Sequence, residues 1–314
     1  MQLLNHALRR IAQMIPVLIL ITVLIFLIIK VIPGDPAQAI LGERASQEAV
    51  QALRHQWGLD RPLWDQYFIY MQHLGHGDLG TSFRYKAEVM QLLPRRAGVT
   101  VFLVLYSTLL AVVVAIPLAV VSALNRDRWP DHVVRVVTTL PLASPVFWMG
   151  ILFLLLFSLR LRWFPASGFG EGGFTDHLKH LFLPALTLSM QFMCLLTRNL
   201  RSGIIDVLQV TYVDFARAKG LSRSAIVVGH ILRSALLSVV TLVGVHLAYA
   251  IGGAVITETI FALPGLGTFM VESIFSRDYQ VVQSLTLMFA LGTMVINLVT
   301  DLVYSVLDPR VRMD

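Results

Sequence analysis

Six long apolar runs divide the chain. They lie near residues 11–29, 98–124, 136–159, 181–197, 234–257 and 283–300, and polar segments separate them. A helix needs about 20 residues to cross the hydrocarbon core of a bilayer, and more when it is tilted. The pattern therefore predicts an all-α membrane protein with six transmembrane helices, of which the fourth is short unless it takes in residues 177–180 or continues to Leu200.

The segment after the first run, residues 33–97, is too long for a simple connection. Ser46 can cap a helix that runs to Trp57, and Gly58 can end it with a left-handed turn. Asp60 and Pro62 then open a second helix, in which large apolar residues recur at intervals of three and four: Leu63, Tyr67, Tyr70, Met71 and Leu74. This amphipathic helix lies at the outer face of the membrane or packs on a partner, and the pattern leaves both interpretations open. The chain is thus divided into residues 1–97, the first helix with its long loop, and residues 98–314, a core of five helices.

The composition agrees with a membrane location, since 56% of the residues are hydrophobic, 14% are charged and the mean hydropathy is +0.72. An even number of spans places both termini on one side, and the excess of Lys and Arg in the short loops marks that side as cytoplasmic. The cytoplasmic set is Arg9, Arg10, Arg126, Arg128, Arg135, Arg198, Arg201, Arg217, Lys219, Arg223, Arg233, Arg310 and Arg312, against Arg160, Arg162, Lys179 and Arg277 on the other side. The net charge of +6 follows from this bias, so it gives no reason to expect a nucleic-acid partner.

The first run also has features of a signal peptide, because Arg9 and Arg10 precede it and residues 37–39 resemble a cleavage site. The run is longer than the usual apolar core of a signal peptide. We therefore interpret it as the first spanning helix.

The six runs contain no Asp, Glu, Lys or Arg, and His246 is the one histidine near the centre of a span. Proton-coupled and ion-coupled transporters usually keep ionisable groups at membrane depth, so this chain offers no such relay. It also has no phosphate-binding loop. The pairs His73 with His76 and His177 with His180 lack the further ligands of a metal site, and the single Cys194 excludes an internal disulfide. We expect no catalytic group and no metal in this chain.

Residues that interrupt helices lie within the spans: Pro117, Pro141, Pro145, Gly244, Gly252 and Gly253. Packing between helices explains most of them, since small residues allow close approach. Others can bend helices around a polar pathway, where freed backbone groups find partners. The uncharged candidates for lining such a pathway are Gln191, His246, Gly252 and Gly253.

The stretch TYVDFARAKGLSRSA, residues 211–225, lies on the cytoplasmic side between the fourth and fifth runs. Thr211 and Asp214 are spaced as in a capping box, and Lys219 with Gly220 can end the short helix that they begin. Ser222 can cap a second helix that leads back into the membrane. This pattern fits a docking element for another protein as well as it fits a plain linker.

The same stretch resembles the conserved cytoplasmic loop of binding-protein-dependent ABC importer permeases. The matching positions are Asp214 for the acidic residue, Ala216 for an alanine and Gly220 for the glycine. Farther along, only Leu232 fits the family pattern, because Arg233 stands at the position of a proline. The departure is similar to the dipeptide, oligopeptide and nickel branch, as are PGDPA at residues 33–37, GLDRPL at 58–63, GDLGTS at 77–82, PGLG at 264–267, RDY at 277–279 and LDPR at 307–310. Gln280 replaces a proline of the pattern, for which we expect a local effect.

The resemblance implies a type I ABC importer permease fold in a bacterial cytoplasmic membrane. It implies that the loop within residues 198–233 couples the permease to its ATPases through Tyr212, Asp214, Phe215, Ala216, Arg217, Ala218, Lys219, Gly220 and Leu221. The implied partners are a second homologous permease, two ATPase subunits that bind ATP and Mg, an extracytoplasmic solute-binding protein and membrane lipid. Di- and oligopeptides are the expected cargo, with nickel chelates or glutathione as alternatives. A self-contained channel is the rival from another class, and a membrane enzyme is disfavoured.

Overall fold

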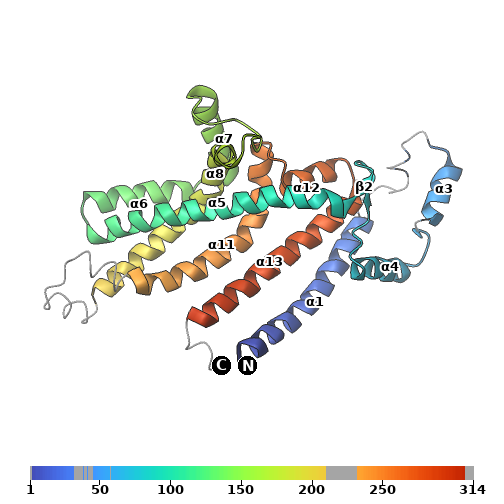
Figure 1. Cartoon of the computed structure of the whole chain (residues 1–314), viewed down its shortest axis with the longest axis horizontal. Coiled ribbons are helices and arrows are strands. Elements are labelled where there is room, and N and C mark those ends of the chain that lie inside the picture. The colour runs from blue at the N-terminus through green and yellow to red at the C-terminus, as the bar shows by residue number, and fades with distance from the viewer. Residues whose placement is uncertain are drawn as a thin grey trace.

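The computed structural model of the chain describes residues 2–31, 38, 41, 45–56, 58–209 and 232–307. Long helices dominate these residues and run roughly side by side in an elongated bundle (Figure 1). Their order is α1 (Gln2–Val31), α3 (Gln47–Gln56), α4 (Leu63–Gly75), β1 (Thr81–Ser82), β2 (Ala87–Glu88), α5 (Val89–Leu124), α6 (Trp129–Leu142), α7 (Val146–Phe153), η1 (Leu154–Arg160), α8 (Phe174–Leu208), α11 (Leu232–Ile260), α12 (Leu266–Phe275) and α13 (Tyr279–Leu307). The strands pair only with each other, in an antiparallel hairpin.

Five of the described helices are long and apolar enough to cross a membrane: Leu8–Ile28 within α1, α5, α8, Val239–Ile260 within α11, and Tyr279–Ser305 within α13. The third apolar run forms two helices, α6 and α7 with η1, which meet at an angle of 107°. Pro145 is the N-cap of α7 in an extended conformation, and a proline disfavours the helical conformation at the residue before it, which explains why the break lies there. The predicted total of six spans is reached when this broken pair counts as one.

Two helix boundaries differ from the sequence prediction. α5 begins at Val89, so the long first loop is shorter than residues 33–97 and the predicted division at residue 97 falls inside a helix. The fourth span extends beyond the apolar run at both ends, from Phe174 to Leu208. Polar side chains in these added turns have partners: Asp176 accepts from the Gly172 backbone N–H, and Arg201 donates to Asp131.

The predicted helices of the first loop are present. The backbone N–H of Ala49 donates to Ser46 Oγ at 3.2 Å at the start of α3, and Gly58 has the expected positive φ of 63° after its end. α4 begins after Pro62, where the sequence predicts the start of the second helix.

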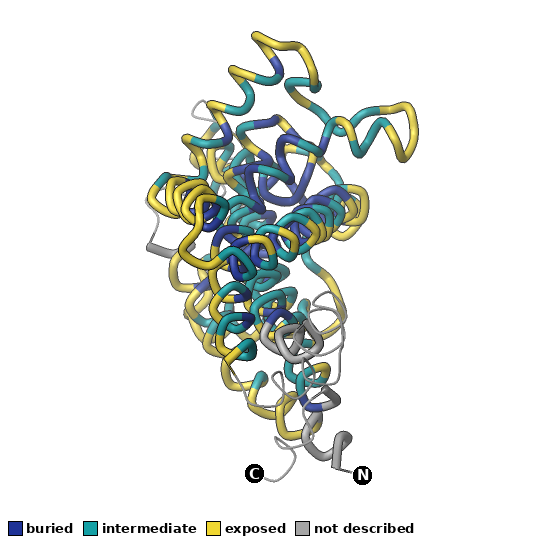
Figure 2. Tube along the Cα trace, turned by 90° about the vertical axis from the view of Figure 1, so that its left-hand side faces the viewer, coloured by how far each residue is buried: buried dark blue, intermediate teal, exposed yellow. Residues whose placement is uncertain are grey.

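The core lies where α5 and α8 pack against each other. On α5, Ala111, Ala115, Ala119 and Ala123 recur every four residues and form one buried stripe. This stripe packs on Phe192, Leu196, Leu200 and Ile204, which also recur every four residues on α8. Small side chains on one helix let the two backbones approach closely. Buried residues accordingly gather inside the bundle, and exposed ones cover its outer sides (Figure 2).

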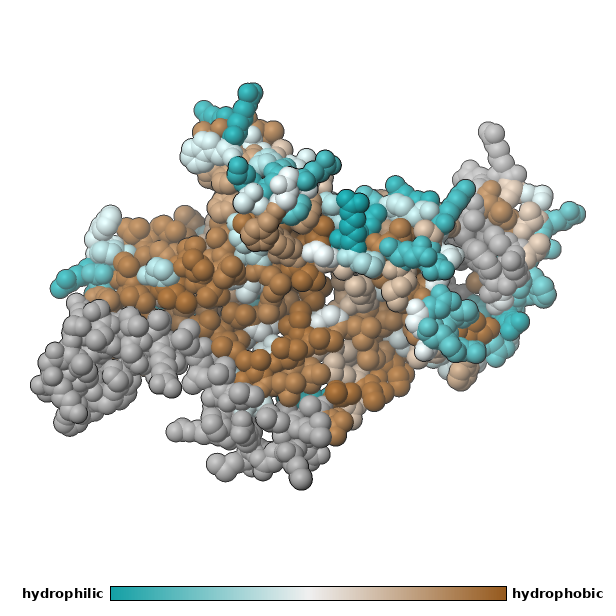
Figure 3. Space-filling model, viewed as in Figure 1, coloured by the Kyte–Doolittle hydropathy of each residue, from teal (hydrophilic) through white to brown (hydrophobic). Residues whose placement is uncertain are grey.

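The outer sides of the helices are apolar and the hydrophilic residues gather toward the ends, as expected for a surface that faces lipid (Figure 3). Exposed leucines and valines follow the outer side of α5 at intervals of four residues: Val101, Leu105, Leu109 and Val113. In water such an exposed apolar face would favour aggregation, whereas in a bilayer it contacts the apolar acyl chains.

The hairpin before α5 is fixed to α12 and α13. Ser82 Oγ donates to the carboxylate of Asp278 at 2.6 Å, and the Gln280 side chain donates to the Leu79 carbonyl at 2.9 Å. Gly80 has a φ of +78°, and a Cβ on it would lie 2.3 Å from the amide nitrogen of Gln280. We expected the replacement of proline by Gln280 to have only a local effect. The Gln280 side chain instead bonds to a loop about 200 positions earlier in the sequence.

A glycine on α11 provides a test of this packing. A Cβ on Gly244 would lie 2.0–2.7 Å from the side-chain atoms of Thr300 on α13. Gly244→Ala is therefore expected to separate the two helices and to lower the free energy of unfolding by about 1–3 kcal/mol. The measurement is unfolding in mixed detergent micelles.

Gly98→Ala is the matched control, since a Cβ at this helical position would meet nothing within 4 Å. It should leave stability unchanged or raise it by up to about 1 kcal/mol. Equal stability of the two variants would contradict the packing of α11 on α13.

Candidate functional site

The predicted coupling residues lie outside the described residues. Tyr212, Asp214, Phe215, Ala216, Arg217, Ala218, Lys219, Gly220 and Leu221 all fall in the interval 210–231. Its two flanks are described: α8 ends at Leu208, and α11 begins at Leu232. Both flanks lie at the same end of the bundle as the turn between α5 and α6 (Figure 1).

A buried ion pair holds α8 beside this interval. Arg201 lies about two turns before the end of α8. It donates from Nε and from one terminal nitrogen to the two carboxylate oxygens of Asp131, at 2.7 and 2.6 Å. Asp131 is fully buried and also accepts hydrogen bonds from the Ser122 hydroxyl and from the Asp127 backbone N–H. A forked pair with its remaining lone pairs satisfied is the geometry in which a buried carboxylate is tolerated.

This ion pair joins three helices. Ser122 belongs to the last turn of α5, Asp131 to the first turn of α6, and Arg201 to α8. The carboxylate also lies at a helix N-terminus, where the backbone dipoles favour negative charge. The end of α8 that leads into the predicted coupling loop is therefore fixed to the α5–α6 turn.

Three of the predicted pathway residues lie at or near the contact between α8 and α11. The His246 ring stacks on Phe192, with ring centroids 3.9 Å apart and planes 3° apart. A Cβ on Gly253 would touch Leu188 at 3.0 Å. Gln191 donates to the Ser144 carbonyl at 3.1 Å and so fastens the corner of the broken third span to α8. All three residues therefore take part in contacts between helices.

Gly252, the fourth predicted residue, lies on an exposed face of α11. Val245, Tyr249, Gly252 and Ile256 follow one another at intervals of four, three and four residues and are all exposed. Residues with this spacing share one side of a helix. Tyr249 is 78% exposed, a large fraction for an aromatic residue in the middle of a span. We call these four residues the α11 stripe; all of them are uncharged.

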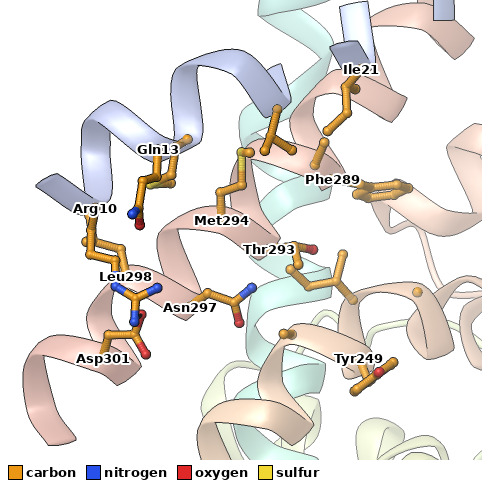
Figure 4. A pocket seen from close by; sticks show the side chains of 16 residues that line it. Arg10, Gln13, Ile21, Tyr249, Phe289, Thr293, Met294, Asn297, Leu298 and Asp301 are labelled. Atoms are coloured by element: carbon orange, nitrogen blue, oxygen red, sulfur yellow. Dashed lines mark ion pairs between the residues drawn. The ribbon is translucent and has the colours of Figure 1, made fainter. Parts of the chain in front are cut away.

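A cavity of about 640 Å³ adjoins the α11 stripe. Residues of α1, α11 and α13 line it, it is open on one side, and Tyr249 and Gly252 form part of its wall (Figure 4). Its polar groups gather toward one end, where Arg10 and Asp301 form an ion pair at 3.3 Å and the side chains of Gln13 and Asn297 lie nearby. Apolar side chains such as Ile21 and Phe289 line the other end.

The described acidic, histidine and cysteine side chains do not gather into one cluster. Among the described residues, no three His, Cys, Asp or Glu side chains come together in a way that could hold a metal ion. The two histidine pairs have local partners instead: His73 meets Asp78 at 2.7 Å, and His177 meets the Phe169 carbonyl at 2.8 Å.

Sequence reasoning missed a second buried acid, Glu258. It lies one residue beyond the fifth apolar run, is fully buried, and accepts hydrogen bonds from the Thr100 hydroxyl at 2.6 Å and the Gly267 N–H at 2.7 Å. Gly265 and Gly267 are required beside it, because a Cβ on either would lie 2.8 Å or less from its carboxylate. The PGLG motif is thus the start of a helix, α12, that is capped by a carboxylate from α11. A single Glu between an apolar run and a glycine-rich turn was the sequence feature that could have indicated this buried acid.

Sequence comparison assigns the family. Residues 115–313 match the family described as binding-protein-dependent transport system inner membrane component, and residues 3–105 match its N-terminal companion. The chain belongs to this family. It is a permease of the ABC importer class and a multi-pass inner-membrane protein. Its family is one of permease subunits that work with a solute-binding protein and an ATPase.

Two named permeases are similar to this one over nearly its whole length. It is 36% identical over 310 residues to the glutathione transport system permease protein GsiC of Salmonella choleraesuis, covering 99% of each chain. It is 36% identical over 332 residues to the dipeptide transport system permease protein DppB of Alkalihalophilus pseudofirmus, covering 99% of this chain and all of that one. The inward-facing MetNI methionine ABC transporter shares the fold, with a TM-score of 0.59 at 14% identity over 70% of this permease and 97% of that chain.

Asp131→Ala tests the buried ion pair. Removal of the carboxylate leaves Arg201 without its partner, and we expect a loss of about 3–5 kcal/mol in the free energy of unfolding. The measurement is unfolding of the purified permease in mixed micelles.

Asp206→Ala is the matched control, since Asp206 is an exposed acid near the same end of α8. Its cost should stay below about 0.5 kcal/mol. Similar losses for the two variants would show that the ion pair does not hold α8 in place.

Proposed function

We propose that this permease is one of two related subunits that together form the pathway of an ATP-driven importer for di- and oligopeptides. The observation that carries the proposal is its similarity to glutathione and dipeptide permeases over 99% of its length. Glutathione is itself a small peptide, so the cargo in the names of both relatives belongs to one chemical class. Nickel chelates remain the alternative cargo within the same branch.

The α11 stripe is the face that we assign to the pathway. It is exposed in the isolated chain, it contains no charge, and it lies beside the cavity between α1, α11 and α13. A second permease opposite this stripe would complete the enclosure. A lining of Val, Tyr, Gly and Ile makes few specific polar contacts, which suits a pathway whose selectivity rests with the solute-binding protein.

Energy enters through the cytoplasmic loop. On this proposal the residues from Tyr212 to Leu221 dock on the ATPase subunits, which bind ATP and Mg, and both termini of the permease are cytoplasmic. The forked ion pair between Asp131 and Arg201 supports a mechanical path from the loop, because α8 cannot shift at that end without α5 and α6. The basic residues Arg126 and Arg128 lie at this same end, as the positive-inside rule requires of a cytoplasmic turn.

Reconstitution tests the class of function. The permease with its second permease, ATPases and binding protein should take up peptide only when ATP is present. ATP-independent flux through this chain alone would contradict the proposal and favour a channel. Identification of the ligand bound to the cognate binding protein decides between peptides, glutathione and nickel chelates.

Gly220→Trp tests the coupling loop. A bulky side chain at the glycine should obstruct docking, so we expect uptake to fall at least about tenfold, the equivalent of about 1.4 kcal/mol of lost coupling. The measurement is uptake together with co-purification of the ATPases. Uptake at the wild-type rate with an intact complex would rule out the coupling role.

Gly252→Leu tests the pathway. A Cβ at this position would meet nothing within 4 Å, so the variant should fold normally while it narrows the space beside the α11 stripe. We expect transport of longer peptides to fall more than transport of dipeptides, with the ATPases still bound.

Gly98→Leu is its control, because this helical glycine also has open space around it and belongs to α5, outside the α11 stripe and the lining of the cavity. It should transport peptides of every length as the wild type does. Unchanged transport by Gly252→Leu would remove the α11 stripe from the pathway.

A further inference from the structure

Helix α4 packs across one end of α1 (Figure 1). The hydroxyl of Tyr67 lies 2.9 Å from that of Thr22, within hydrogen-bond distance. The ring of Phe26 meets Tyr67 edge-on at 5.6 Å and stacks with Tyr70 at 6.4 Å. α4 is therefore fixed to α1 by one side of its surface.

The contact between α4 and α1 lies within the apolar span of α1, below its end. Thr22 and Phe26 both belong to the apolar span Leu8–Ile28. Thr22 lies six residues before the end of that span, and at 1.5 Å per residue this is about 9 Å below its end. Helices that lie in a membrane interface are buried to about 5–10 Å. α4 thus touches α1 at the level of the boundary between headgroups and acyl chains.

Two large aromatic residues of α4 are left uncovered. Trp64 is 76% exposed and Phe68 is 69% exposed. Four residues separate them, so they project from the same side of the helix, next to the side that packs on α1. α1 is also apolar and exposed near this level, since Leu24 and Ile28 are 48% and 59% exposed.

The side opposite Trp64 is polar. His73 follows Trp64 by nine residues, which at about 100° per residue is half a turn around the helix. Its imidazole pairs with Asp78 at 2.7 Å, and both side chains are more than half exposed. The Gly80 backbone N–H, and after it His73, hold the pKa of Asp78 below its ordinary value, so this carboxylate is an anion that needs water. Gln66, on the same side as His73, donates to the backbone carbonyl of Arg61 at 2.7 Å.

We propose that α4 is an interfacial helix, with Trp64 and Phe68 inserted among the lipids of the leaflet at which α1 ends, and with His73 facing water. Aromatic residues are favoured at this level because their rings tolerate both apolar chains and headgroups. The depth of the contact with Thr22 selects lipid over the binding protein, since a soluble partner does not reach below the headgroups. The proposal goes beyond the transport function and holds whichever side of the membrane is cytoplasmic.

Spin labels give the direct test. Single cysteines replace Trp64, Phe68 or His73 in a Cys194→Ala background, and each labelled permease is assembled with its second permease and ATPases in phosphatidylethanolamine and phosphatidylglycerol nanodiscs. Labels at positions 64 and 68 should collide more with oxygen than with a water-soluble nickel chelate. The label at position 73 should show the reverse order.

Two results would overturn the proposal. Greater collision with the nickel chelate at positions 64 and 68 would place them in water. Protection from both reagents would place them against protein, and a repeat without the binding protein would show whether that protein covers them.

A second measurement keeps the native fold intact. Trp64→Phe retains an aromatic ring, and its fluorescence in nanodiscs with brominated lipids is compared with that of the wild type. The emission that the substitution removes, taken as the difference between the two proteins, belongs to Trp64 and should be quenched by the brominated lipid. A difference that the brominated lipid leaves unquenched would show that Trp64 does not contact lipid.

Discussion

The close contact between α5 and α8 is the constraint on which the rest of the bundle depends. An alanine every fourth residue on α5, from Ala111 to Ala123, lets α8 approach, and the larger residues of α8 fill the space. In lipid this packing cannot draw on the hydrophobic effect as it does in water, so close contact between backbones and buried polar pairing must supply the stability. The ion pair between Asp131 and Arg201 holds α8 next to the end of α5 at one end of the bundle. α6 and α11 then pack on a pair of helices whose relative position is already fixed.

Acidic groups occur at the two ends of this bundle and not at its centre. Asp131 joins α6 to α8 at one end, and Glu258 joins α11 to α5 and α12 at the other. Each is fully buried and each is satisfied by hydrogen bonds from several groups. Removing a hydrogen-bond partner from a buried acid is costly, so each of these acids fixes the helices that it joins. In the described spans, the acids with buried hydrogen bonds thus lie toward the ends of the helices, where they join one helix to the next.

The sequence predicted the local structure well and the contacts between distant segments poorly. Apolar runs located the spans, and a serine cap with a left-handed glycine located α3, because both signals depend on neighbouring residues. The prolines near residue 145 indicated a bend, but its angle of 107° depends on how α6 and α7 pack against α8. Asp131 and Arg201 are 70 positions apart, and no periodicity connects them. His246 and Gln191 were chosen as polar residues in a span, and only the structure shows that Phe192 and Ser144 engage them.

The hairpin before α5 shows how a departure from a family pattern can be accommodated. A proline at position 280 would have no side-chain donor, whereas Gln280 donates to the Leu79 carbonyl. Ser284 donates to the same carbonyl at 3.0 Å, so the loop is held twice by α13. Gly80 is needed because the Gln280 amide occupies the space that a Cβ would fill. The first loop and the last helix are therefore fixed to each other at the end of the bundle opposite the ion pair between Asp131 and Arg201. The bundle is thus held by polar contacts between distant segments at both of its ends.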